Sequence, residues 1–170
     1  LMQRCPDLEV VVAGRDRVAY SYPAPSHGGS WKQHLLAELG DQLDRSRLHF
    51  TGLLNYGDYV RLLQRSDLHV VLSRPYVTSW GLFQAAACGS QLMVNHDPSI
   101  DYVLTDQQVL RVDLDQPQQL LDSAACWLEG AEQRRGIKRA SMLKPEWELT
   151  SCLQQWQRLL QQSMAAQAAS

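Results

Sequence analysis

The chain has 170 residues, of which 45% are hydrophobic and 20% charged, and its formal net charge is −2. This length suits one domain with a full hydrophobic core, because two independent domains would each be small. A nearly neutral chain without a basic block has no electrostatic reason to take nucleic acid or an anionic membrane as its main partner.

The first part of the chain predicts two strands and two helices. Residues 8–13 and 47–51 are apolar runs of strand length, and each precedes a glycine. A loop rich in Pro, Gly and Ser follows the first run, and a helix is expected from Ser30, because Ser30 and Gln33 form a capping box. The second helix follows the second run and ends near residue 67.

The alternation of strands and helices continues in the second part of the chain. Asp97 and Pro98 are typical of the cap and the first residue of a helix. From Ala131 onward we expect helices only, broken at Pro145. The elements expected before residue 131 are, in chain order, a strand at 68–73, a helix at 80–88, a strand at 91–95, a short helix from Pro98, a strand at 109–113 and a helix at 117–130.

This alternation predicts the fold class. Strands that alternate with helices across short loops favour an α/β protein with a three-layer, Rossmann-like parallel sheet and helices on both faces, followed by an all-helical C-terminal segment. In such sheets ligands bind outside the carboxyl ends of the strands. The positions to consider for a site therefore follow the strands, at residues 14–16, 52–54, 73–79 and 95–97.

The segment from Leu72 to Gly89 carries the most specific pattern, Leu-Ser-Arg-Pro-Tyr-Val-Thr-Ser-Trp-Gly-Leu-Phe-Gln-Ala-Ala-Ala-Cys-Gly. It resembles the signature of the C-terminal, nucleotide-sugar-binding domain of family-four retaining GT-B glycosyltransferases (glycosyl transferases group 1). There a strand ending in Ser leads through a loop with a glutamate to a helix with a Glu-Ala-Met-Ala-x-Gly run. Ser73 matches the strand end, residues 84–89 match the run, and residues 75–80 are similar to a Pro-aromatic-x-x-Ser-Trp loop of one bacterial branch.

The resemblance covers roughly residues 5–130 and implies a domain organisation. Residues 1–130 would form the Rossmann-like donor-nucleotide-binding domain, lacking its first strand. Residues 131–170 would be helices that pack on the same domain or on the N-terminal domain of the full-length protein.

The loop of Val77, Thr78 and Ser79 leads to a helix start, where free N–H groups and the helix dipole suit a diphosphate. The resemblance implies that Gln84 stands where a glutamate contacts the ribose. It also implies that the main chain of Gly52, Leu53 and Leu54 holds the nucleobase, and that Tyr76 occupies the position of the first glutamate.

Other interpretations of these residues stay open. Ser79 could serve only as a helix cap, Gln84 as a structural residue and Tyr76 as a loop aromatic. Glutamine at 84 keeps an acceptor but loses the charge, so ribose binding would be about tenfold weaker. His69 is interpreted as structural, whereas His96 could face the ligand edge.

The resemblance implies the donor-binding domain of a retaining glycosyltransferase of hexosyltransferase type. It would transfer a sugar from a nucleoside diphosphate sugar to a glycan or lipid acceptor, with the N-terminal acceptor domain as partner. We expect no cofactor, no metal and no catalytic residue in this part, which alone should be inactive. The alternative is a degenerate, non-catalytic Rossmann-like binding or interaction domain.

The sequence also favours a cytoplasmic location. No secretory leader or membrane-spanning apolar run is seen, although membrane association of the full protein is compatible with such an enzyme. The four cysteines form no CxxC pair, and three, among them Cys126, lie in apolar helical surroundings, so we expect those to be buried.

Overall fold

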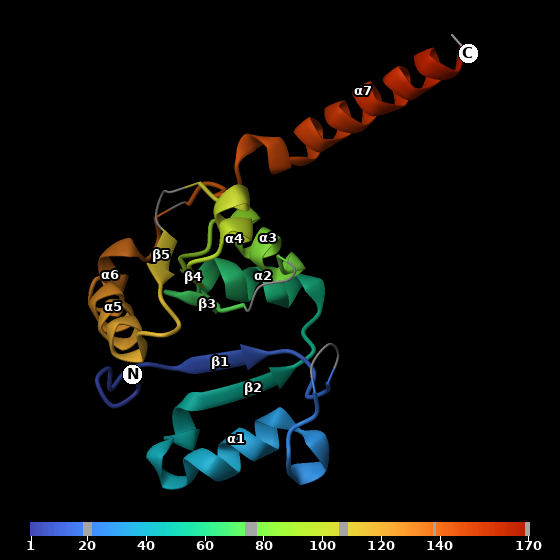
Figure 1. Ribbon diagram of the computed structural model, residues 1–170. Coiled ribbons are helices and arrows are strands. Elements are labelled where there is room, and N and C mark those ends of the chain that lie inside the picture. The colour runs from blue at the N-terminus through green and yellow to red at the C-terminus, as the bar shows by residue number, and fades with distance from the viewer. Residues whose placement is uncertain (19–21, 74–77, 106–108, 138, 169–170) are drawn as a thin grey trace. The chain divides into compact units, whose positions relative to one another are not determined.

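The computed structural model describes residues 1–18, 22–73, 78–105, 109–137 and 139–168. These residues form two compact units, Leu1–Leu62 and Leu63–Ser170. Figure 1 shows the elements of both units.

The first unit contains a two-stranded parallel sheet of β1 (Val10–Ala13) and β2 (Leu48–Gly52). Helix α1 (Trp31–Leu39) connects the strands, and its start is confirmed, since the Ser30 hydroxyl accepts a hydrogen bond from the N–H of Gln33 at 3.0 Å. The described part of this connection also contains three short 3-10 turns: η1 (His27–Gly29), η2 (Gly40–Gln42) and η3 (Arg45–Arg47). Helix α2 (Tyr56–Arg65) follows β2 and carries the chain into the second unit.

The second unit is built on a three-stranded parallel sheet in the order β3 (His69–Val71), β4 (Leu92–Asn95) and β5 (Val109–Val112). All four residues of the central strand β4 are buried, because it has a strand on each side and helices against it. The connecting and following helices are α3 (Trp80–Ala87), α4 (Pro98–Val103), α5 (Pro117–Glu129) and α6 (Ala131–Arg134).

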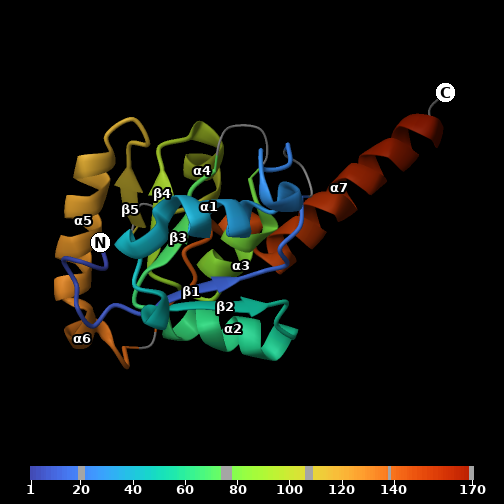
Figure 2. The same cartoon turned by 90° about the horizontal axis from the view of Figure 1, so that it is seen from below.

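The hydrophobic core of the second unit lies between this sheet and its helices. Figure 2 shows α5 beside β5 and α3 toward the β3 side of the sheet. The buried core side chains come from helices and strands alike: Leu63, Leu82, Ala85, Ala86, Leu92, Met93, Val94, Ile100, Val103, Leu104, Val112 and Ala124.

The expected fold class is confirmed: the chain is a mixed α/β protein with parallel strands flanked by helices, consistent with a Rossmann-like domain. In the first unit β1 pairs with β2 across the connection through α1, and in the second unit β4 pairs with β3 and β5 across the connections through α3 and α4.

An extended strap at residues 139–144 was not expected in a stretch predicted to be helical. The N–H of Met142 donates to the carbonyl of Ala86 at 2.9 Å, and the N–H of Lys144 donates to that of Val103 at 3.0 Å. The strap leads through the turn η4 (Pro145–Trp147) to the helix α7 (Leu149–Ala168). It thereby ties the end of α3 to the end of α4.

The expectation that the cysteines of helical segments are buried was wrong. Cys126 is exposed, and Cys5, Cys88 and Cys152 are only half-buried. Cys126 lies two residues after the buried Ala124 on α5, which places it on the opposite face of the helix.

Candidate functional site

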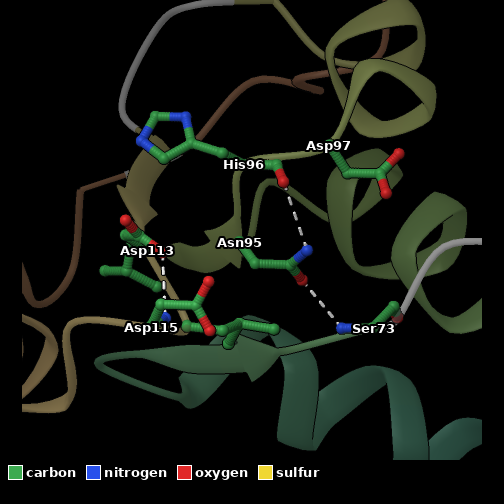
Figure 3. A pocket seen from close by; sticks show the side chains of 8 residues that line it. Ser73, Asn95, His96, Asp97, Asp113 and Asp115 are labelled. Atoms are coloured by element: carbon green, nitrogen blue, oxygen red, sulfur yellow. Dashed lines mark hydrogen bonds between the residues drawn. The ribbon is translucent and has the colours of Figure 1, made fainter.

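A cavity of about 330 Å³ opens at the carboxyl ends of β3, β4 and β5 (Figure 3). Its size lies at the lower end of the range of small-molecule sites, which is about 300–1,000 Å³. Its position is the one at which parallel α/β sheets bind ligands. The lining residues all follow or end a strand: Ser73, Asn95, His96, Asp97, Val112, Asp113, Leu114 and Asp115.

The side chain of Asn95 connects two other residues that line this cavity, Ser73 and His96. Asn95 is the last residue of β4 and only 5% exposed, and its Oδ1 accepts a hydrogen bond from the N–H of Ser73 at 2.8 Å. Its Nδ2 donates to the carbonyl of His96 at 3.5 Å. Figure 3 shows the side chain between these two partners. Asn95 therefore fixes the chain after β3 to the chain after β4.

Three carboxylates give the cavity an acidic character. Asp97 accepts hydrogen bonds from the hydroxyl and the N–H of Ser99 at 2.6 and 2.8 Å, and these bonds lower the pKa of its carboxyl. Asp113 accepts from the N–H of Asp115 at 2.9 Å. Carboxylates accept hydrogen bonds but repel phosphate, so this side of the cavity suits hydroxyl groups of a ligand.

The start of α3 lies next to the start of α4 in the same unit. Ser79 caps α3, because its hydroxyl accepts a hydrogen bond from the N–H of Gly81 at 3.1 Å. Thr78 donates through its hydroxyl to the carbonyl of Ser99 at 3.5 Å, and Ser99 is the second residue of the helix that Asp97 caps. The positive ends of the two helix dipoles are therefore close together.

The expected site residues are distributed over both units. Thr78, Ser79 and the half-buried Gln84 lie in the second unit. Gly52 and Leu54 in the first unit flank Leu53, which is 67% exposed. The two other expected residues, Tyr76 and Val77, lie outside the described residues.

A protein-family model described as glycosyl transferase-like matches residues 2–162. The chain belongs to the glycosyl transferase-like family. Membership supports a transferase that moves glycosyl groups. A comparison with curated proteins found no match.

None of the residues that line the cavity of this glycosyl transferase-like chain was among the expected site residues. Residues 95–97 were recognised as following a strand, but the site was placed on the loop before α3. Asp113 and Asp115 follow β5 in the same way. The rule that ligands bind at the carboxyl ends of parallel strands, applied to every strand, would have found them.

Two further findings, on metal binding and on membrane-spanning helices, concern the described part of the glycosyl transferase-like chain. Within that part, no three side chains of His, Cys, Asp or Glu come together so that they could hold a metal ion. Its helices include none with the length and apolar character needed to cross a membrane.

Proposed function

We propose that this chain is the donor-binding domain of a retaining glycosyltransferase of hexosyltransferase type. The full-length enzyme would transfer a sugar from a nucleoside diphosphate sugar to a glycan or lipid acceptor. The observation that carries the proposal is the cavity at the carboxyl ends of β3, β4 and β5, beside the capped start of α3. A glycosyl transferase-like protein needs a pocket for an activated sugar, and this cavity has a suitable position and chemistry.

The donor would lie across two chemically different parts of this region. Its diphosphate would bind at the start of α3, near Ser79, where N–H groups and the helix dipole favour negative charge. Its sugar hydroxyls would donate to Asp97, Asp113 or Asp115, which line the cavity. A nucleoside diphosphate sugar carries both kinds of group, whereas a free phosphate would be repelled by the carboxylates.

The remaining assignments come from the family resemblance. Gln84 would contact the ribose as a neutral acceptor, and the main chain of Gly52, Leu53 and Leu54 would hold the nucleobase. Residues 1–130 would act as the donor-nucleotide domain, and residues 131–170 would pack on it or on an N-terminal acceptor domain. We propose that this donor binding needs no metal or cofactor.

Titration calorimetry of the 170-residue chain with UDP, GDP, ADP and a sugar derivative of each tests the proposal. We expect one nucleotide to bind with a Kd of about 1 mM or below, a free energy of about −4 kcal/mol. Gln84→Ala should weaken this binding about three- to tenfold, because it removes one hydrogen bond. Gln162→Ala, which changes an exposed glutamine of α7, is the matched control and should bind normally.

The alternative function is a degenerate binding domain, which the uncharged Gln84 favours. It predicts that no nucleoside diphosphate binds, either to this chain or to a longer chain that carries a further N-terminal strand. That outcome would contradict donor binding.

A further inference from the structure

The lining of the cavity at the carboxyl ends of β3, β4 and β5 is unbalanced in charge. It contains three carboxylates, Asp97, Asp113 and Asp115, and among the residues described there it contains no Lys or Arg. His96 is the one side chain of this lining that can carry a positive charge. An anionic group of a ligand would therefore meet negative charge without a permanent cation to offset it.

Asp113 and Asp115 form no ion pair within the part of the chain that the structure describes. Asp113 accepts a hydrogen bond from the N–H of Asp115 at 2.9 Å, and neither carboxylate has a Lys or Arg partner there. Arg111, two residues before Asp113, is instead paired with Asp101 at 2.8 Å. The negative charge of Asp113 and Asp115 therefore acts on whatever ligand the cavity holds (Figure 3).

Asn95 supplies the cavity with a neutral hydrogen-bond donor. It is 5% exposed, and its Oδ1 accepts a hydrogen bond from the N–H of Ser73 at 2.8 Å. One N–H of its amide donates to the carbonyl of His96 at 3.5 Å, and the other has no acceptor among the described residues. A buried N–H without a partner is costly, so this group favours a ligand oxygen in the cavity.

Hydroxyl groups match this combination of acceptors and one neutral donor. A hydroxyl donates to a carboxylate and also accepts from an amide N–H, so a sugar that carries only hydroxyls satisfies both parts of the lining. A carboxylate only accepts, and its strong partners in proteins are Arg and Lys. Placed in this cavity, a ligand carboxylate would lie near Asp113 and Asp115 and would be repelled.

We propose that Asp113 and Asp115 make the cavity selective for a donor whose sugar is uncharged, and that they exclude uronic acids. The inference rests on the proposed function, because it assigns the cavity to the sugar of a nucleoside diphosphate sugar. In that proposal the diphosphate lies at the start of α3, so its charge needs no place among the carboxylates. Asp97 is not assigned to the selectivity, because its carboxylate caps α4.

Titration calorimetry with matched donors tests the selectivity. The 170-residue chain is titrated at about pH 8, above the usual titration range of histidine, which removes a protonated imidazole from the comparison. The ligands are UDP, GDP and ADP, each alone, with glucose, galactose or mannose, and with the uronic acid of the same sugar. We expect at least one neutral donor to bind about tenfold or more tightly than its uronic acid. About 0.5 M NaCl should reduce this ratio of affinities, because salt screens exposed charges.

The double variant Asp113→Asn, Asp115→Asn tests whether these two residues cause the selectivity. Asparagine retains a side-chain oxygen, so the hydrogen bond from the N–H of residue 115 is kept. In this variant the ratio of affinities should fall to about threefold or less. The control Glu146→Gln, Glu148→Gln removes the same charge from two exposed residues outside the cavity, and its ratio should equal that of the unaltered chain.

Three outcomes would overturn the selectivity. They are a uronic acid donor that binds as tightly as its neutral counterpart, an unchanged ratio in the Asp113 and Asp115 double variant, and an equal fall of the ratio in the control variant. In each of them a nucleotide still binds, so donor binding stands. If no nucleotide binds at all, the proposed function fails, and the assignment of the cavity to a donor sugar fails with it.

Discussion

The imidazole of His69 in the second unit is largely buried, and burial disfavours its protonated form. His69 begins β3, and burial lowers the pKa of its imidazole below the usual value of 6.5, because the charged form would lose its hydration. The sequence interpretation of His69 as a structural residue agrees with this position. The residue should therefore stay neutral in the folded protein.

The lowered pKa of His69 predicts a pH-dependent stability. The unfolded state takes up a proton as the pH falls below about 6.5, whereas the folded state takes it up only at a lower pH. The free energy of unfolding therefore has its full value above about pH 6.5 and decreases below it. We expect the urea midpoint to fall less between about pH 7.5 and 5.5 in His69→Asn than in the unaltered chain.

The control for His69 is His27→Asn, which changes an exposed histidine of the first unit. This variant should keep the pH dependence of the unaltered chain. If the urea midpoint falls as much at acidic pH in His69→Asn as in His27→Asn, His69 is not the group that causes the loss of stability.

Helix α3 shows what a local pattern can predict at the scale of an element. The sequence predicted a helix at residues 80–88, and α3 is found at Trp80–Ala87 with Ser79 as its cap. Gly89, with a φ of +67°, follows its end. A Cβ at Gly89 would lie 2.7 Å from the carbonyl oxygen of Ala140, so only glycine fits under the strap. The strap itself was missed, because its hydrogen bonds go to residues far away in the sequence.

The cap of α3 predicts a measurable contribution to stability. Ser79→Ala removes the acceptor for the N–H of Gly81 and should lower the free energy of unfolding by about 1 kcal/mol. Ser79→Asp, which restores an acceptor, should recover most of this loss. Chemical denaturation of both variants measures the change in the free energy of unfolding. An unchanged midpoint in Ser79→Ala would show that the cap does not stabilise the fold.

The two compact units of the molecule differ in how much apolar surface they bury. Among the described residues of Leu1–Leu62, the one fully buried hydrophobic residue is Ala24, whereas β4 and its neighbouring helices in Leu63–Ser170 form a continuous core. In β1, the side chains of Val11 and Val12 are 41% and 43% exposed. Burial of apolar surface supplies most of the stability of a fold, so the second unit should be the more stable.

This difference predicts unequal hydrogen exchange. The backbone amides of β4, at Leu92–Asn95, should exchange more slowly than those of β1, at Val10–Ala13, because only the former lie in a buried core. Native-state hydrogen exchange read by mass spectrometry or NMR measures both segments in one experiment. Equal protection of the two strands would contradict the unequal stability of the units.

The sequence alone determined the class of the fold, the positions of the strands and several helix starts. These depend on local causes: continuous apolar runs form buried strands, and Ser30, Ser79 and Asp97 satisfy free N–H groups within two or three residues of themselves. Of the candidate site, the sequence indicated the loop before α3 and the positions that follow the strands.

Only the tertiary structure decided which of these positions meet. Asn95 holds Ser73 across 22 residues of sequence, and the carboxylates after β5 join the same cavity because β5 pairs with β4. Likewise, Trp147 reaches Phe83 and Tyr102 only through the strap. Such contacts arise from strand order and side-chain packing over long sequence separations, which no local periodicity encodes.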